Sequence, residues 1–304
     1  MKLESVELDD RLTERRNPRS KAVDHLSIQE VVDLINSEDH LIASAVGAER
    51  KSIARCVELV VDSLRRGGRL FYIGAGTSGR LGVLDAAEMP PTYRTDPELV
   101  QGLIAGGYAA LVRAQEGAED DREAGAHELA ERALSPLDFV LGIATSGTTP
   151  YVHGALDYAR SIGARTGFLL CTPPSPELRE KHDVVIAPLV GPEVITGSTR
   201  MKAGTATKMV LNTISTTTMV QLGKVYGNLM VDLEVTCQKL QDRGERILMG
   251  ILGLGREEAR FLLDESGGHV KTALVMGRLG LDRAEAQRRL EEADGKVANV
   301  LGEA

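Results

Sequence analysis

Short apolar runs alternate with longer segments of helical periodicity along most of the chain. The runs at residues 69–73, 99–104, 139–144, 166–171 and 184–190 are rich in Leu, Ile, Val and Phe, which is typical of buried parallel strands. Between most of them lie segments whose apolar positions recur three and four residues apart, as on one face of a helix. The alternation predicts the α/β class: a parallel-sheet αβα sandwich with helices on both faces.

Helical patterns without strands dominate both ends of the chain. Before the first strand, an irregular arm over residues 1–27 leads to a capping-box helix that starts at Ser27, and a second helix is expected over 41–64. The region after the last strand predicts long helices over 199–226 and 230–248, followed by short ones. We expect two domains, residues 1–248 with the sheet and residues 249–304 as a small all-helical C-terminal domain of three helices at 256–265, 269–279 and 283–293.

Composition limits the ligands, surroundings and binding partners that the protein is expected to have. The chain of 304 residues carries 36 Lys and Arg against 44 Asp and Glu, a net charge of −8 that argues against nucleic acid or an anionic membrane surface. No run approaches the roughly 18 uncharged apolar residues of a membrane span. The three cysteines lie far apart in no CxxC pair, which indicates free thiols and a cytoplasmic location. The six histidines show no HExxH spacing, so we expect no metal.

A glycine-rich turn follows the first strand. Residues 74–79, Gly-Ala-Gly-Thr-Ser-Gly, match the dinucleotide fingerprint GxGxxG between a strand and a helix. A dinucleotide site also needs an acidic residue about 20 positions on, at the end of the next strand. That strand ends in Ile104-Ala105-Gly106 and has no carboxylate there. Backbone N–H groups beside the hydroxyls of Thr77 and Ser78 suit one phosphate group instead, so we expect a monophosphate ligand and no cofactor.

A second turn of the same kind follows the strand at 139–144. Both turns would open at the carboxyl edge of the sheet, where α/β folds bind ligands. The alternative is that Ser and Thr merely cap the helices that follow. The candidate phosphate-binding residues of the two turns are Thr77, Ser78, Gly79, Ser146, Gly147, Thr148 and Thr149.

Four blocks of sequence resemble the N-acetylmuramic acid 6-phosphate etherases, a family with the sugar isomerase (SIS) fold that binds phosphosugars. They span residues 67–93, 116–120, 146–152 and 196–208, and the shorter segments 13–18 and 227–232 also resemble the family. Two positions depart from the family pattern as we expect it, because Met89 stands where Cys is common and Thr148 where Arg occurs.

The resemblance implies a reaction as well as a fold. The expected reaction cleaves the D-lactyl ether of N-acetylmuramic acid 6-phosphate by elimination and hydration, giving N-acetylglucosamine 6-phosphate and D-lactate in the recycling of cell-wall amino sugars. It implies a phosphosugar partner and no cofactor. The alternatives are a non-catalytic phosphosugar sensor and an aldose–ketose isomerase of the same fold.

Two carboxylates are implied as the acid–base pair of this reaction. Glu88 is the candidate acid, because it ends the helix that starts at the phosphate turn, where the helix dipole disfavours a negative charge. Glu119 is the candidate base, although Glu116, Asp120 and Asp121 compete with it on sequence alone. Which of the pair is acid and which is base stays open. In the block at 196–208, Ser198 and Lys202 are further candidate substrate ligands, and Arg80 and Arg200 are further cations.

The spacing of Ser78 and Glu88 predicts a dimer. Ten residues of helix separate them, which is roughly 15 Å at 1.5 Å per residue and long for one sugar phosphate to span. We therefore expect a homodimer with the site near the subunit interface, where Glu88 serves the partner's ligand.

Overall fold

The computed structural model describes residues 11–233 and 238–302. The chain divides into two compact units: unit 1 comprises Met1–Ala87 and Glu98–Ile214, and unit 2 comprises Glu88–Pro97 and Ser215–Ala304. This division differs from the expected boundary at residue 248, because the helix α11 (Gln238–Leu252) packs on the C-terminal helices and belongs with them. No helix among the described residues is long and apolar enough to cross a membrane.

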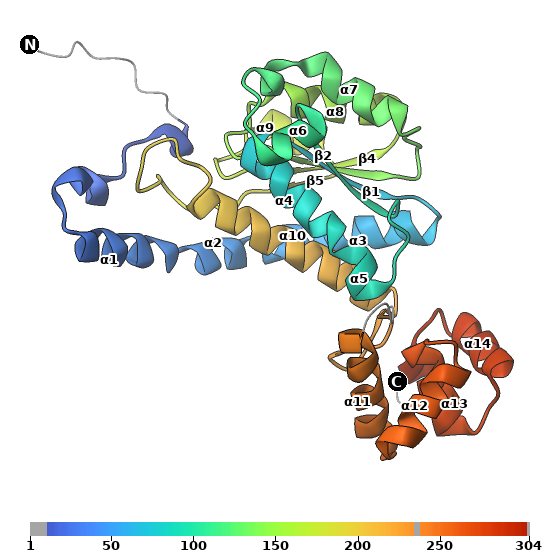
Figure 1. Cartoon of the computed structure of the whole chain (residues 1–304). Helices are drawn as coiled ribbons and strands as arrows, with labels where there is room; N and C mark the ends of the chain where they lie inside the picture. The colour runs from blue at the N-terminus through green and yellow to red at the C-terminus, as the bar shows by residue number, and fades with distance from the viewer. Residues whose placement is uncertain (1–10, 234–237, 303–304) are drawn as a thin grey trace, which may run out of the picture. The chain divides into compact units, whose positions relative to one another are not determined.

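Unit 1 is built on a parallel sheet of five strands, which confirms the predicted fold class (Figure 1). The order is β2-β1-β3-β4-β5, so β1 lies between β2 and β3 and both glycine turns leave central strands. Each strand matches an expected run, although the last one stops at Ile186 and not at Val190. The bounds are Leu70–Gly74 for β1, Val100–Ile104 for β2, Phe139–Ile143 for β3, Arg165–Leu169 for β4 and Val184–Ile186 for β5.

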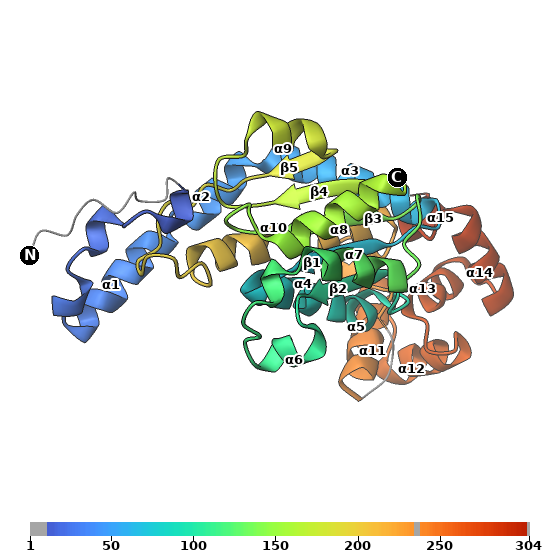
Figure 2. The ribbon, with the colours of Figure 1, turned by 90° about the horizontal axis from the view of Figure 1, so that it is seen from above.

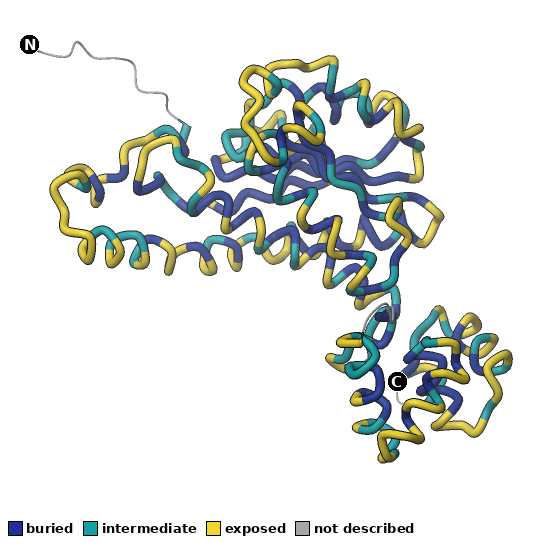
Figure 3. The backbone as a smooth tube through the Cα atoms, viewed as in Figure 1, coloured by how far each residue is buried: buried dark blue, intermediate teal, exposed yellow. Residues whose placement is uncertain are grey.

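Helices cover both faces of the sheet, and alternate side chains of the strands pack against opposite layers. The helices α7 (Arg122–Glu131) and α8 (Pro150–Ser161) lie on one face, and α3 (Arg50–Arg65) and α4 (Gly76–Ala87) lie on the other (Figures 1 and 2). Phe71 and Ile73 belong to the core cluster beneath α8, whereas Tyr72 faces Gly82 of α4. Figure 3 shows the strands as buried, which explains their continuous apolar composition.

The N-terminal region largely follows its sequence pattern. Three short 3-10 turns (η1, Leu12–Glu14; η2, Pro18–Ser20; η3, Val23–His25) precede α1 (Ile28–Asp39), whose capping box between Ser27 and Glu30 is present. The expected helix over 41–64 is divided into α2 (Ile42–Ala48) and α3, because Glu49 has a non-helical ψ of 7°.

The proline-containing segment after Glu88 is helical. Met89–Tyr93 forms α5, with both prolines in its first turn. Proline is tolerated there because the first N–H groups of a helix have no partner within it. The connections to β3 and β5 contain α6 (Gly107–Val112), η4 (Ala118–Asp120) and α9 (Pro176–Lys181).

Two expected helices after β5 differ in the structure. The helix α10 (Lys202–Gln221) ends before Gly223, and a short hairpin of β6 (Val225–Tyr226) and β7 (Leu229–Met230) follows where helices were expected. Gly223 and Gly227 have φ values of 71° and 55°, which few other residues adopt. Residues 234–237 of the expected helix lie outside the described residues. The short helices α12 (Arg256–Glu265), α13 (Val270–Leu279) and α14 (Arg283–Glu292) match their predictions, and α15 (Val297–Leu301) was not predicted.

Candidate functional site

A cavity of about 540 Å³ lies in unit 1 at the carboxyl ends of β1 and β3. The first and second glycine turns form two of its walls, as expected for parallel strands whose carboxyl ends meet at one edge. Seven hydroxyl side chains line it: Thr77, Ser78, Thr145, Ser146, Thr148, Thr149 and Thr199. Its charged lining residues are Arg11, Glu14, Glu119 and Asp120.

The first glycine turn contains two residues that line the cavity and one glycine that allows a helix to pack on a strand. Thr77 and Ser78 line the cavity in the first turn of α4, which starts at Gly76. Gly79, expected to bind phosphate, is not among the lining residues. A Cβ at Gly79 would lie 2.6 Å from the carbonyl oxygen of Gly74, so the glycine allows α4 to pack closely on β1.

The second turn presents two adjacent hydroxyls. Ser146 Oγ lies 3.0 Å from Thr148 Oγ1. Gly147 has φ of 79°, and its carbonyl oxygen lies 2.9 Å from His153 Nε2, so this glycine shapes the turn. Thr149 is the N-cap residue of α8 but its side chain makes no capping hydrogen bond. The capping alternative therefore does not account for Thr149, whose side chain lines the cavity.

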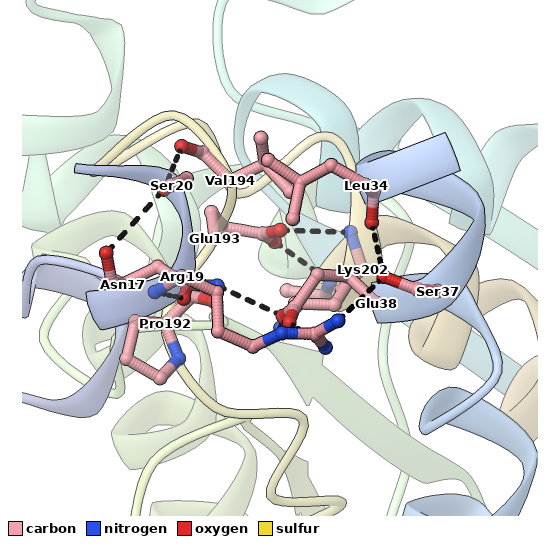
Figure 4. Close-up of polar contacts among 11 residues, drawn as sticks. Asn17, Arg19, Ser20, Leu34, Ser37, Glu38, Pro192, Glu193, Val194 and Lys202 are labelled. Carbon is pink, nitrogen blue, oxygen red and sulfur yellow. Dashed lines mark hydrogen bonds and ion pairs between the residues drawn. The ribbon is translucent and has the colours of Figure 1, made fainter. Parts of the chain in front are cut away.

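The segment before α10 forms a third wall through Gly197 and Thr199. Ser198, the predicted neighbour, does not line the cavity among the described residues. Lys202 is also absent from the wall: its ammonium group is buried and forms an ion pair with Glu38 of α1 (Figure 4). The expectation that Lys202 contacts the phosphate has no support in this placement.

The Glu193 side chain connects the segment before α10 to the first residues of that helix. Its carboxylate accepts hydrogen bonds from the backbone N–H groups of Lys202 (3.0 Å) and Ala203 (2.9 Å), which satisfies the start of α10 (Figure 4). Burial raises the pKa of Glu193, and these two N–H groups and the charge of Lys202 oppose that rise.

Two residues of the N-terminal arm that were not predicted also line the cavity. Arg11 Nη1 donates a hydrogen bond of 2.9 Å to Thr148 Oγ1. Glu14 also lines the cavity, and its Oε2 would lie 3.3 Å from a Cβ on Gly197. Glu14 falls within the segment 13–18 that resembles the etherases, which was a usable signal. Arg11 carried no such signal, because nothing in its local sequence indicates its distant contact.

Of the two candidate catalytic carboxylates, one belongs to a residue that lines the cavity and the other does not. Glu119 lies on η4 and lines the cavity together with Asp120. Glu88 belongs to unit 2, whereas all the described lining residues belong to unit 1. Glu88 is moreover the N-cap residue of α5, and its carbonyl oxygen accepts a hydrogen bond of 3.3 Å from Thr92 N–H. Glu88 therefore lies at the negative end of the α4 dipole and also at the positive end of the α5 dipole, so the two dipoles act on its carboxylate in opposite senses.

A smaller cavity of about 170 Å³ adjoins the first and shares Ala75, Gly76 and Glu119 with it. Arg80 lines this smaller cavity, but its guanidinium donates hydrogen bonds to the carbonyl oxygens of Ala110 (2.6 Å) and Leu111 (3.1 Å). Arg80 thus supports the start of the connection that carries Glu119.

Comparison with known proteins identifies the class of the domain. A family model for the N-terminal SIS domain of the glucokinase regulatory protein matches residues 52–160, which include both glycine turns. A parallel sheet with a hydroxyl-lined cavity at its carboxyl edge, together with this match, defines an SIS-type domain. Among solved structures, the phosphoheptose isomerase GmhA from Neisseria gonorrhoeae is 19% identical with a TM-score of 0.47, covering 63% of this chain and 98% of its own.

Relatives that match most of the chain are more specific. An N-acetylmuramic acid 6-phosphate etherase of Gloeobacter violaceus is 58% identical over 264 residues, 87% of this chain and 86% of its own length. One of Rhodopirellula baltica is 53% identical over 269 residues, 88% of this chain and 89% of its own. The chain belongs to the N-acetylmuramic acid 6-phosphate etherase family.

Proposed function

We propose that this protein is a carbon–oxygen lyase that cleaves the D-lactyl ether of N-acetylmuramic acid 6-phosphate. The products are N-acetylglucosamine 6-phosphate and D-lactate. The observation that carries the proposal is that the hydroxyl turns and Glu119 line one cavity in a chain 58% identical to a named etherase.

The chemistry explains why such a cavity suffices. Opening of the sugar ring exposes an aldehyde at C1, which makes the proton at C2 removable. A base takes that proton, the C2–C3 double bond forms, and the C3–O bond breaks with its electron pair on the lactate oxygen, which an acid protonates. Water then adds across the double bond, with OH at C3 and H at C2. Each positioned acid or base typically contributes about 10²- to 10⁴-fold.

The described residues of the cavity divide into binding and catalytic roles. The hydroxyls of Thr77, Ser78, Ser146, Thr148 and Thr149 hold the phosphosugar. Glu119 is the proposed base at C2. Asp120 shares the wall with Glu119 and is the competing candidate for that role.

Glu88 is the proposed acid, acting in the cavity of a second subunit of a homodimer. It follows α4 ten residues after Ser78, about 15 Å along a helix, and that distance supports sharing of the site. Co-expression of Glu88→Ala and Ser146→Ala chains tests this arrangement. Mixed dimers with one intact site should regain up to about a quarter of wild-type activity on statistical assembly. Two inactive variants that never complement each other would exclude sharing.

The direct test is release of D-lactate from N-acetylmuramic acid 6-phosphate by the purified protein. A second candidate function is a phosphosugar sensor, because residues 52–160 match a domain of a regulatory protein, but the named etherase relatives do not favour it. A sensor would bind the phosphosugar and release no lactate, and an isomerase would convert only aldose or ketose phosphates.

We further propose a cytoplasmic location, which the buried free thiols of Cys56 and Cys171 support.

A further inference from the structure

Residues 11–20 of the N-terminal arm contribute the cation of the cavity. Among the residues that the structure describes, Arg11 is the one cationic side chain in this wall, beside the carboxylates of Glu14, Glu119 and Asp120. The whole chain has a net charge of −8. A phosphate monoester carries close to two negative charges near neutral pH, so a local positive group strengthens its binding beyond what hydroxyls and backbone N–H groups supply.

Arg11 lies beside the second turn. Its Nη1 is 2.9 Å from Thr148 Oγ1, which in turn is 3.0 Å from Ser146 Oγ. One guanidinium and two hydroxyls thus converge on one wall of the cavity. A guanidinium presents planar N–H donors that match two oxygens of a phosphate, a geometry that adds specificity as well as binding energy.

The arm is held in place by a buried polar cluster. Asn17 Nδ2 donates hydrogen bonds to Glu38 Oε2 (2.8 Å) and to the carbonyl oxygen of Pro192 (3.1 Å) (Figure 4). Ser20 Oγ donates one of 2.7 Å to the carbonyl oxygen of Val194. These contacts fix the arm against residues 192–194, which lead into the wall that contains Gly197 and Thr199.

Lys202 completes this cluster from the start of α10. Its ammonium group contacts the same Glu38 oxygen that accepts from Asn17. A single buried carboxylate therefore joins three segments that are distant in sequence: the arm, the end of α1 and the first residue of α10. The arm and the segment before α10 are the two that reach the cavity.

We propose that Arg11 binds the phosphate of the phosphosugar together with Ser146 and Thr148, and that the Lys202–Glu38 pair positions the arm for this contact. The proposal gives Lys202 a positioning role in place of direct contact. It rests on the proposed function only for the identity of the sugar, because phosphate binding can be measured without turnover.

The test is equilibrium binding of N-acetylglucosamine 6-phosphate by calorimetry, with inorganic phosphate as a competitor. Arg11→Gln should weaken binding of both at least tenfold, and Arg11→Lys should recover part of the loss. Arg50→Gln, which makes the same charge change at an exposed position of α3, should bind as wild type does. Wild-type binding without lactate release would overturn the lyase and leave this proposal standing.

A second ligand identifies the anion that Arg11 contacts. N-acetylmuramic acid without phosphate retains the lactyl carboxylate, and its weaker binding should be the same in wild type and Arg11→Gln. If Arg11→Gln binds N-acetylglucosamine 6-phosphate normally, or if only lactyl-bearing ligands lose affinity, the phosphate assignment is wrong.

The positioning role is tested by limited trypsin digestion of the arm at the exposed Arg15 and Arg16. Lys202→Met and the double variant Glu38→Gln/Lys202→Met, which leaves no unpaired buried charge, should both be cut there faster than wild type and show a raised KM with a smaller change in kcat. Bound phosphosugar should slow the cleavage. The double variant with wild-type cleavage and KM would overturn the positioning role even if Lys202→Met does not fold.

Discussion

The ammonium group of Lys202 and the carboxylate of Glu38 form an ion pair in the interior of unit 1, with 2% and 4% of their side chains exposed. Burial raises the pKa of Glu38, but the hydrogen bond and charge of Lys202, the amide of Asn17 and the charge of Arg19 outweigh it. The pKa of Glu38 therefore lies below its ordinary value. A lowered carboxyl pKa stabilises the fold above the unfolded pKa, and that contribution is lost as the pH falls through the folded one.

Removing one partner of this pair should be costly. Lys202→Met leaves the buried Glu38 carboxylate without its ammonium partner, and we expect a loss of about 3–5 kcal/mol in the free energy of unfolding. Urea unfolding at neutral pH measures it. Arg55→Gln breaks the exposed pair with Glu58 and should cost at most about 1 kcal/mol. Equal losses in the two variants would show that the buried pair does not stabilise the fold as argued.

The contact between α7 and α8 depends on glycine. A Cβ at Gly154 would lie 1.9 Å from the carbonyl oxygen of Arg122, and one at Gly125 would lie 2.0 Å from that of Tyr151. Gly154→Ala must therefore push the helices apart, and we expect a loss of about 3 kcal/mol or more. Gly47→Ala in α2 meets nothing within 4 Å and should be neutral or stabilising by up to about 1 kcal/mol. Thermal unfolding compares them, and a stable Gly154→Ala protein would contradict the close packing.

The sequence predicts those parts of the structure whose pattern lies within a few consecutive residues. A strand such as Leu70–Gly74 is a continuous apolar run between breakers, and its glycine turn follows at once. The cavity walls at Ser78 and Ser146 followed because parallel strands place their carboxyl ends at one edge. The hairpin at β6 and β7 was missed because each strand has only two residues, too few for a period to appear.

The sequence does not predict the parts of the structure that depend on contacts between residues far apart in the chain. Lys202 lies in a block that resembles the etherases, and only the structure places it against Glu38, 164 positions away in the chain. Arg11 likewise meets Thr148 across 137 positions. Whether a polar side chain binds a ligand or joins a buried ion pair thus depends on tertiary contacts. The spacing of residues along the sequence does not encode these contacts.

His182 should make unit 1 sensitive to mild acid. It is 5% exposed, its Nδ1 lies 3.0 Å from Thr166 Oγ1, and burial, together with the nearby charges of Lys181 and Arg160, lowers its pKa to about 4. Below its ordinary pKa of 6.5 the unfolded chain binds a proton that the folded chain does not, so stability falls as the pH falls.

The expected loss for His182 is about 3 kcal/mol between pH 7 and pH 4. Comparing urea unfolding at the two pH values with that of His182→Gln measures it, because the variant lacks this titration and should lose about that much less. His127→Gln removes an exposed imidazole paired with Glu131 and should follow the wild-type pH dependence closely. A His182→Gln protein with the full wild-type acid sensitivity would place the titrating group elsewhere.

Glu119→Gln tests the proposed base. The substitution keeps the size of the side chain and its place in the cavity wall but removes the group that accepts the C2 proton. We expect kcat for D-lactate release to fall by about 10²- to 10⁴-fold. Binding of N-acetylglucosamine 6-phosphate should change little, because the hydroxyls of the two turns and Arg11 remain.

Two matched variants separate this role from its alternatives. Asp120→Asn changes the neighbouring carboxylate of the same wall, and Glu123→Gln changes an exposed carboxylate in the first turn of α7. Both should keep kcat within about tenfold of wild type if Glu119 is the base. A large loss in Asp120→Asn with an active Glu119→Gln would transfer the role to Asp120. In the variant that lacks the true base, exchange of the C2 proton of the product with solvent deuterium should also slow, because the same group removes and returns that proton.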